Sequence, residues 1–530
     1  MAYVITQNCC KDASCVPVCP VDCIRPVGGP GEFTGTEMLY IDPESCIDCG
    51  ACMDECPVDA IHYEEDLPAE LVRFKDINAA YFDRHPLESD SSPSPKRRST
   101  TEPLRVAIVG AGPAACYAAA ELIDIDGVEI ELFERLPTPY GLIRAGVAPD
   151  HQRTKSVVGI FDQVFTDQRF GCHFNVEVGR DLTHEDLVAH HHAVIYAVGA
   201  ANSRALGIPG EQRAGHHAAA DFVGWYNGHP DHAGHQFDLT SRRAVIIGNG
   251  NVALDVARVL LMNHEQLAAS DIADHALKAL FGSAIDEVLI LGRRGPRFGA
   301  FSAGELLALG HLDGIDVIID GGDLDDNPDD SVETALKLQI VREYAQRSPT
   351  AGAKRIVLRF NSTPVEIVGT EHAEGLRVSR DGESELIEAS LILSSIGYYG
   401  SPVPGLPHDP RHGVIPNDGG RVIDDSGEPL PGVYVTGWIK RGPRGVIGTN
   451  RICAQETVAA LWADFTDGGL KHEVADRDSL HRLLDQRGVT PVRWQGWRAI
   501  DAAERRRGAE ASRPRVKFVA IEEMLAAARG

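Results

Sequence analysis

Seven cysteines near the start of this 530-residue chain have the spacing needed to hold iron–sulfur clusters. The clearest run is Cys46-x2-Cys49-x2-Cys52-x3-Cys56-Pro57, and a partial copy, Cys9-x5-Cys15-x3-Cys19-Pro20, precedes it. Thiolates at this spacing, closed by a proline, are typical of iron–sulfur segments. Zinc sites normally use two C-x2-C pairs far apart in sequence. The sequence therefore favours iron–sulfur clusters over zinc.

The pairing of the two runs is expected to be crossed, because the fourth cysteine of each run ligates the other cluster in two-cluster segments. One set is then Cys19 with Cys46, Cys49 and Cys52, which suits [4Fe–4S]. The other is Cys9, Cys15 and Cys56, and three thiolates suit [3Fe–4S]. Cys10 either replaces Cys9 or adds a fourth ligand, which would permit a second [4Fe–4S] cluster. Cys23 has no place in either run and is expected to be a free thiol.

A second type of chemistry is indicated by Gly110-Ala111-Gly112-Pro113-Ala114-Ala115. The apolar run Val106–Val109 before it predicts a buried strand, Cys116–Ile123 predicts a helix, and Val128–Phe133 predicts a further strand that ends at Glu134. A strand, a G-x-G-x-x-A turn, a helix and a strand with a terminal acid form a unit that binds a dinucleotide. The glycines let the backbone approach a pyrophosphate at the helix N-terminus, and the acid accepts hydrogen bonds from ribose hydroxyls.

The same turn recurs at Gly248-Asn249-Gly250-Asn251-Val252-Ala253, before a helix expected from Leu254. Its later strand, Glu287–Leu291, is followed by Arg293 and Arg294 where an NAD site carries an acid. Guanidinium groups at this point suit the 2′-phosphate of NADP. The second unit is therefore expected to bind NADP(H).

Composition limits the function further. A net charge of −26 argues against nucleic-acid binding, which needs a basic face. There is no apolar run of the length needed to cross a bilayer and no recognisable signal peptide, so the expectation is a cytoplasmic protein without membrane insertion. Oligomeric state is not predicted. Residues 1–66 carry 13 acidic and 2 basic side chains, which is typical of a carrier that docks on a positive surface.

These motifs together resemble a known family. Residues 104–530 resemble the adrenodoxin-reductase-type ferredoxin–NADP reductases in the stretches Pro137–Leu142, Gly146–His151, Gly248–Arg258, Gly292–Pro296 and Gly437–Pro443. Residues 1–66 resemble the seven-iron bacterial ferredoxins, including Met38–Asp42 and Pro57–Ile61 around the second cysteine run. The whole chain is thus similar to actinobacterial NADPH–ferredoxin reductases with a fused ferredoxin segment.

The resemblance implies an α/β fold with two Rossmann-like dinucleotide-binding domains, the NADP domain inserted in the FAD domain, after a small α+β ferredoxin domain. The expected boundaries are 1–66 for the ferredoxin domain, 67–103 for a linker, 104–240 and 391–530 for the two parts of the FAD domain, and 241–390 for the NADP domain.

The resemblance also implies roles for individual residues. FAD would contact Gly110, Gly112, Ala114, Glu134, Leu142, Val178, Trp438, Gly445, Val446 and Ile447. NADPH would contact Gly250, Asn251, Val252, Arg293, Arg294 and Glu305. His151 and Glu305 are the candidates for ordering water and protons near the flavin.

The function that follows is an FAD-dependent NADPH–ferredoxin oxidoreductase. A hydride passes from NADPH to FAD, and single electrons then pass to the attached clusters, a separate ferredoxin or another one-electron acceptor. Two alternatives stay open at this point. One is an electron-input subunit of a larger synthase, resembling the glutamate synthase small subunit, and the other is a redox sensor without turnover.

Overall fold

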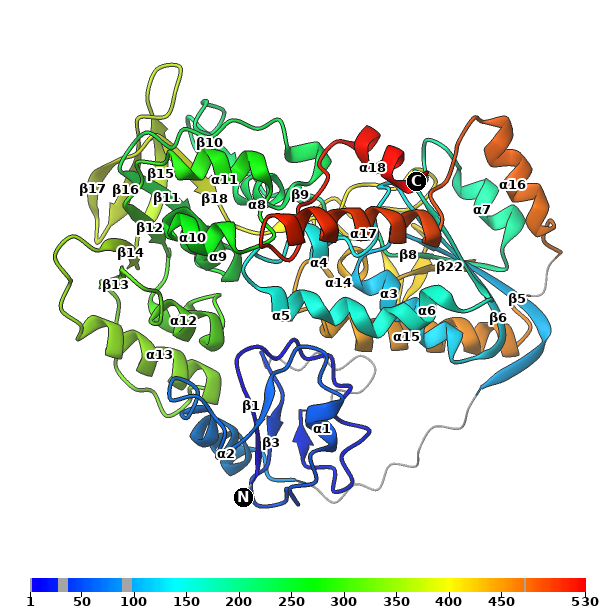
Figure 1. Cartoon of the computed structure of the whole chain (residues 1–530), viewed down its shortest axis with the longest axis horizontal. Coiled ribbons are helices and arrows are strands. Elements are labelled where there is room, and N and C mark those ends of the chain that lie inside the picture. Colours follow the sequence, from blue (N-terminus) through cyan, green and yellow to red (C-terminus); the bar gives the residue numbers. More distant parts are fainter. Residues whose placement is uncertain (1, 27–36, 88–97, 471–472) are drawn as a thin grey trace.

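The computed structural model describes residues 2–26, 37–87, 98–470 and 473–530, which form two large, mainly parallel sheets above a cysteine-rich N-terminal segment (Figure 1). The N-terminal segment is built on two short antiparallel pairs, β1 with β4 and β2 with β3. Its elements are β1 (Tyr3–Ile5), β2 (Ile24–Arg25), β3 (Tyr40–Ile41), α1 (Ala51–Asp54), β4 (Ile61–Tyr63) and α2 (Phe74–Arg84).

Helix α2 lies inside the stretch that the sequence analysis assigned to a linker, 67–103. Its buried Asn78 donates from Nδ2 to the carbonyl of Ile5 (2.8 Å), and Oδ1 accepts from the backbone N–H of Ile41 (2.9 Å). The helix thereby joins strands β1 and β3, so the boundary at residue 66 is wrong and the N-terminal domain continues through α2. The Ser/Pro-rich stretch 88–97 lies outside the described residues, and Ser99 already belongs to the next sheet.

The first large sheet has the strand order β20-β21-β22-β8-β5-β6-β7. Its five strands from β22 to β7 are parallel, and the apolar runs at β5, β6 and β8 are buried on both faces, as parallel sheets require. The strands are β5 (Ser99–Val109), β6 (Asp126–Glu134), β7 (Phe170–Phe174), β8 (Ala193–Tyr196), β20 (Asn417–Asp418), β21 (Arg421–Ile423) and β22 (Pro429–Val435).

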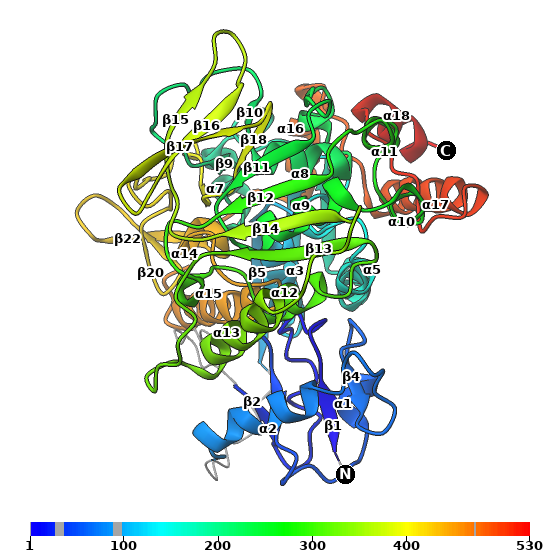
Figure 2. The same cartoon turned by 90° about the vertical axis from the view of Figure 1, so that its left-hand side faces the viewer.

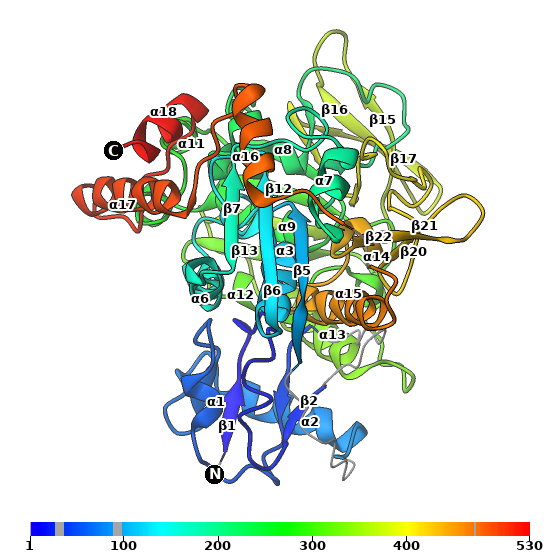
Figure 3. The same ribbon diagram turned by 90° about the vertical axis from the view of Figure 1, so that its right-hand side faces the viewer.

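Helices before and after the second sheet cover this first sheet (Figure 3). The two that bear most on the site are α3 (Pro113–Ile123) and α15 (Thr449–Thr466), which pack along each other. The others are α4 (Leu142–Ala145), α5 (Gln152–Lys155), the 3-10 turn η1 (Ser156–Phe161), α6 (Asp162–Thr166), α7 (His184–His190), α14 (Trp438–Arg441), α16 (Arg477–Gln486), α17 (Trp494–Glu510) and α18 (Ile521–Ala528).

The second large sheet is parallel throughout and has the order β10-β18-β11-β12-β14-β13 (Figure 2). Its strands are β10 (His216–Ala218), β11 (Arg243–Ile247), β12 (Glu287–Leu291), β13 (Ile315–Asp320), β14 (Lys354–Arg359) and β18 (Leu391–Ser394). Its helices and turns are α8 (Ala219–Asn227), η2 (Pro230–His232), α9 (Asn251–Leu261), α10 (His264–Ala268), α11 (Asp274–Phe281), η3 (Pro296–Phe298), α12 (Ala303–Leu309) and α13 (Val332–Ala345).

The remaining strands form smaller sheets, and the three-stranded one packs on the second large sheet. A three-stranded antiparallel sheet joins β15 (Thr363–Val368), β16 (Gly375–Arg380) and β17 (Glu383–Glu388), and β9 (Asn202–Ser203) pairs with β19 (Tyr398–Tyr399).

The strand pairing in the second sheet differs from two of the predicted domain boundaries. Strands β10 and β18 lie outside the predicted range 241–390, yet both pair within the second sheet. The chain therefore enters this domain before residue 241 and leaves it after residue 390. A short apolar strand does not reveal its sheet from its own sequence, because its partners are more than a hundred residues away.

Candidate functional site

The first dinucleotide turn lies between β5 and α3, as predicted. Gly110 has φ +102°, and a Cβ there would lie 2.6 Å from the carbonyl oxygen of Ala197, so only glycine fits. Gly112 caps α3, and a Cβ on it would meet nothing within 4 Å. The turn thus leaves open space at a helix N-terminus, where N–H groups and the helix dipole favour a pyrophosphate.

Glu134 ends strand β6 beside this turn. Its Oε2 accepts from the backbone N–H of Ala111 (2.9 Å), and Oε1 accepts from that of Leu136 (3.0 Å). Burial raises the pKa of its carboxyl above the ordinary value, against the effect of these N–H donors. The carboxylate is therefore held at the turn, where ribose hydroxyls could donate to it.

The C-terminal part of the chain returns to the same turn. Gly437 has φ +76°, and a Cβ there would lie 2.5 Å from the Cβ of Ala114. Trp438 then begins α14, and the backbone N–H of Val446 donates to Oγ1 of Thr449 (3.1 Å) at the start of α15. Trp438, Gly445, Val446 and Ile447 are thus brought towards the turn that carries Gly112 and Ala114.

Two further predicted FAD residues lie near Glu134 or the turn. Leu142 follows Gly141, whose Cβ would lie 2.9 Å from Cα of Gly112, and Leu142 itself is 48% exposed. An exposed leucine at this point is available to a ligand. Val178 is half-buried, two residues after Val176, whose N–H donates to the carbonyl of Glu134 (2.9 Å).

The second turn repeats this construction between β11 and α9. A Cβ on Gly248 would lie 2.1 Å from the carbonyl oxygen of Ser395, whereas one on Gly250 would meet only Ala300, at 3.9 Å. Asn251 and Val252 open α9, and Oδ1 of Asn251 accepts from the N–H of Ser302 (2.7 Å). This contact links the turn to α12, which carries Glu305.

Arg293 and Arg294 follow β12 and are both exposed. The guanidinium of Arg294 lies over the ring of Phe298, 4.9 Å from its centroid. Within the described ranges neither arginine has a carboxylate partner, whereas Arg297, three residues on, is paired with Asp330. The two predicted phosphate ligands are therefore the arginines of this loop that remain available to an anion.

His151 and Glu305, predicted from distant parts of the chain, are brought together. Nδ1 of His151 lies 3.9 Å from Oε1 of Glu305. Oε2 of Glu305 is buried without a hydrogen-bond partner, 3.6 Å from Nη1 of Arg258, which is likewise unpartnered. Burial, with the nearby charge of Asp255, raises the pKa of Glu305. The carboxyl of Glu305 is thus favoured to hold a proton next to the His151 ring.

Sequence reasoning missed Arg258 as a member of this group. It is buried and donates to Asp150 (2.8 Å) and to Asp255 (2.8 Å), one helical turn earlier on α9. The Asp-x-x-Arg spacing was a visible signal, since residues three apart share a helix face. The contact of Arg258 with Asp150 depends on the fold, because these two residues are 108 positions apart in sequence.

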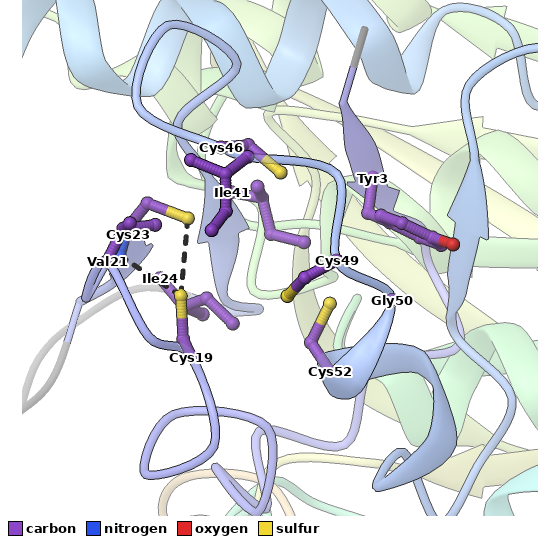
Figure 4. Close-up of a pocket in the computed structure, with 11 residues that line it drawn as sticks. Tyr3, Cys19, Val21, Cys23, Ile24, Ile41, Cys46, Cys49, Gly50 and Cys52 are labelled. Atoms are coloured by element: carbon purple, nitrogen blue, oxygen red, sulfur yellow. Dashed lines mark hydrogen bonds between the residues drawn. The ribbon is translucent and has the colours of Figure 1, made fainter.

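The nine cysteines of the N-terminal segment separate into two groups. One pocket is lined by Cys19, Cys23, Cys46, Cys49 and Cys52, and Figure 4 shows the sulfur atoms of Cys46, Cys49 and Cys52 turned towards the space that Cys19 also faces. Cys23 lies at its edge, with Sγ 3.5 Å from Sγ of Cys19. The four cysteines expected to share one cluster are therefore together.

A second pocket is lined by Cys9, Cys10, Cys15 and Cys56. Backbone N–H groups donate to its sulfur atoms, from Lys11 to Cys9 (3.4 Å) and from Ala60 to Cys56 (3.3 Å). Such donors are typical of cluster sulfur ligands and tune their potential. Cys9, Cys15 and Cys56, the three expected to share a cluster, thus line one pocket together with Cys10.

The second pocket adjoins the domain of the first sheet. The N–H of Gly448 donates to the carbonyl of Cys10 (2.9 Å), and a Cβ on Gly448 would lie 1.9 Å from the carbonyl oxygen of Lys11. Arg451 donates to the carbonyl of Asp12 (3.0 Å). The loop beside this pocket therefore rests on the start of α15, next to Gly445–Ile447.

The N-terminal segment also contacts the second sheet's domain. Arg73 makes a bidentate pair with Glu343 (3.1 and 3.2 Å), and Lys337 pairs with Glu37 (2.7 Å). In Figures 1 to 3 this segment lies against both large domains. The described part of the chain contains no helix long and apolar enough to cross a membrane.

Comparisons with known proteins agree with this division. Residues 39–62 match the family of 4Fe-4S binding domains, and residues 104–290 match the family described as pyridine nucleotide-disulphide oxidoreductase. A probable ferredoxin/ferredoxin–NADP reductase of Mycobacterium tuberculosis is 49% identical over 100% of this chain and 95% of its own length. The corresponding protein of Mycobacterium leprae is 47% identical over 100% of this chain and 98% of its length.

A solved structure shows the same fold for the reductase part. Mycobacterium tuberculosis FprA in complex with NADPH aligns with a TM-score of 0.77 at 43% identity, covering 81% of this chain and 100% of that chain. With its cysteine-rich segment and two dinucleotide turns, the chain belongs to the family of the ferredoxin/ferredoxin–NADP reductases.

Proposed function

We propose that the chain is an NADPH–ferredoxin oxidoreductase that passes electrons to iron–sulfur clusters in its own N-terminal segment or to a separate ferredoxin. The observation that carries the proposal is the contact between Gly448 and Cys10 (2.9 Å), which joins the flavin-side turn to a cysteine pocket. Bound FAD would supply the conversion between the two electrons of a hydride and the single electrons of a cluster.

The FAD ligands proposed are Gly110, Gly112, Ala114, Glu134, Leu142, Val178, Trp438, Gly445, Val446 and Ile447. The fit is supported by the open space beside Gly112 and by the exposed Leu142. Glu134 would accept hydrogen bonds from ribose hydroxyls while its own N–H donors keep it oriented.

The NADPH ligands proposed are Gly250, Asn251, Val252, Arg293, Arg294 and Glu305. Arg293 and Arg294 would bind the 2′-phosphate through charge-assisted hydrogen bonds. His151 and Glu305 would order water and protons between the two domains, because Oε2 of Glu305 is buried without a hydrogen-bond partner, 3.6 Å from Nη1 of Arg258.

For the clusters we propose [4Fe–4S] on Cys19, Cys46, Cys49 and Cys52, and [3Fe–4S] on Cys9, Cys15 and Cys56. Cys10 lines the second pocket as well, and a second [4Fe–4S] cluster would require its thiolate. We favour three ligands because the first run, Cys9-x5-Cys15-x3-Cys19, lacks the middle cysteine of a C-x2-C-x2-C run.

The test is purification of the full chain followed by flavin and iron analysis and assays with NADPH. The proposal predicts about one FAD per chain, about seven irons, and NADPH-dependent reduction of both ferricyanide and cytochrome c. Absence of flavin, or a failure to oxidise NADPH with ferricyanide, would contradict it. About eight irons without a [3Fe–4S] signal would contradict only the assignment of the second cluster.

A further inference from the structure

The first cysteine pocket is bordered by apolar side chains that face solvent. Ile47 is 58% exposed, Met53 is 41% exposed and Val21 is 36% exposed. Ile47 and Val21 line the pocket, Met53 follows Cys52 in α1, and Cys49 between them is an exposed thiol. We call Val21, Ile47, Cys49 and Met53 the Ile47 surface. Clustered exposed apolar side chains commonly mark a site where another protein binds.

The Ile47 surface is exposed although the reductase domains pack against the same N-terminal segment. The two cysteine pockets differ in this respect. Beside the second pocket, Cys10 is buried and the loop at Lys11 and Asp12 is covered by Gly448 and Arg451. The chain therefore closes one pocket against its own reductase and presents the other outward.

The charges around the Ile47 surface are almost all negative. Glu44, Asp54 and Glu55 are exposed beside it. The two basic residues of segment 1–66 offer little compensation, because Lys11 is buried and Arg25 makes a bidentate pair with Asp22 (2.8 and 2.7 Å). An apolar centre with an acidic rim complements a partner with an apolar centre and a basic rim.

We propose that the Ile47 surface is the docking site for a separate protein, a one-electron acceptor whose redox group is ringed by lysine or arginine side chains. The inference rests on the proposed function and adds the place where the partner binds. Electrostatic attraction would orient the partner, and contact with Ile47 and Met53 would bring it against the wall of the pocket that holds Cys49.

The test uses the full-length holoprotein and oxidised cytochrome c, a basic haem protein, as the probe. Binding is measured by calorimetry at low ionic strength without NADPH, so the readout is a Kd rather than turnover. Ile47→Ala should raise the Kd at least fivefold. A chain with Glu44→Lys and Asp54→Lys should raise it at least tenfold and flatten its dependence on salt.

Matched controls separate the surface from general effects. Phe281→Ala removes an apolar side chain that is 70% exposed in α11, and Glu522→Lys with Glu523→Lys makes the same charge change in α18. Both controls should bind cytochrome c as the unmodified chain does. All variants should keep the EPR signals of their clusters and the rate of ferricyanide reduction by NADPH.

Three outcomes would overturn the docking site: no binding of cytochrome c by the unmodified chain, unchanged Kd in the Ile47-surface variants, or equal weakening in the controls. Failure of the proposed function is distinguishable, because it would appear as lost ferricyanide reduction in the unmodified chain whatever the Kd for cytochrome c.

Discussion

The hydroxyl of Tyr117 donates a hydrogen bond of 2.7 Å to Oδ2 of Asp12, across 105 positions of sequence. Tyr117 lies on α3, the helix that follows the first dinucleotide turn, and Asp12 lies in the loop of the second cysteine pocket. Burial and the charge of Asp12 raise the pKa of Tyr117 well above its ordinary value, so the phenol stays protonated and donates. This buried bond joins the cysteine-rich segment to the reductase at the point where electrons would cross.

Tyr117→Phe should weaken the contact between the cysteine-rich segment and helix α3 without unfolding the reductase. A hydrogen bond to a charged group contributes roughly 1.5–3 kcal/mol, so its loss should increase opening of the Asp12 loop by tenfold or more. Hydrogen exchange of residues 9–15 should become faster, while ferricyanide reduction by NADPH stays unchanged. The matched control is Tyr344→Phe, which loses a buried bond to the carbonyl of Leu306 in the second domain. An unchanged rate of hydrogen exchange at residues 9–15 would show that this hydrogen bond does not hold the Asp12 loop against α3.

Arg293→Ala and Arg294→Ala should each raise the KM for NADPH by about tenfold and barely change the use of NADH. The reason is that charge-assisted bonds to the 2′-phosphate are available only with NADPH. Steady-state kinetics with both nucleotides checks this. Arg297→Ala is the control, since Arg297 is already paired with Asp330. Equal damage to NADPH and NADH would mean that Arg293 and Arg294 shape the loop instead.

Cys15→Ser should abolish the EPR signal of an oxidised [3Fe–4S] cluster, whereas Cys23→Ser should retain it. Cys15 lines the second pocket, and Cys23 lies beside Cys19 in the first. Cys10→Ser should also retain the signal if three thiolates hold that cluster. Loss of the signal with Cys10→Ser, and its persistence with Cys15→Ser, would require a different ligand set.

His173 should make the first sheet's domain less stable as the pH falls below about 6.5. The ring is buried, its Nε2 lies 3.2 Å from Oε1 of Glu131, and Nδ1 accepts from Arg493 (2.9 Å). Burial lowers the pKa of His173 from 6.5 to about 4. The unfolded chain therefore binds nearly one more proton between these pH values, so acid favours unfolding.

Other charged and aromatic side chains surround His173. Glu131 also meets His191 (2.9 Å) and Arg477 (3.3 Å), and the ring of His481 lies 5.7 Å from that of His173. The hydrogen bonds from His173 and His191 outweigh burial and lower the pKa of Glu131, so its stabilisation is also lost in acid. In His173→Leu the fall in melting temperature between pH 6.5 and 5 should be smaller than in the unmodified chain. An identical fall would exclude His173 as the cause.

Local sequence was sufficient to predict the strands and helices that flank the two dinucleotide turns. The predicted strand Glu287–Leu291 is β12 exactly as bounded, and the first strand, helix and strand are β5, α3 and β6. Each is specified by residues close together: an apolar run, two glycines and a helix start.

Features that depend on distant contacts were not predictable from the sequence. Helix α2 has apolar residues at helical spacing, Phe74, Ile77, Tyr81 and Phe82, and all four are buried. The hydrogen bonds of Asn78 with Ile5 and Ile41 depend on the fold, because their partners are distant in sequence. The loop of Cys10 on Gly448 and the bond of Tyr117 to Asp12 join segments that are remote in sequence. Motifs identified the two kinds of site, but only the fold shows which cysteine pocket lies against the reductase.

The most direct test of the account is an anaerobic titration of the full-length protein with NADPH, followed by absorption and EPR spectroscopy on the same samples. The account predicts that NADPH bleaches the flavin absorption and removes the signal of the oxidised [3Fe–4S] cluster within one preparation. Bleaching of the flavin with a cluster signal that persists would contradict electron delivery from the reductase to the attached segment.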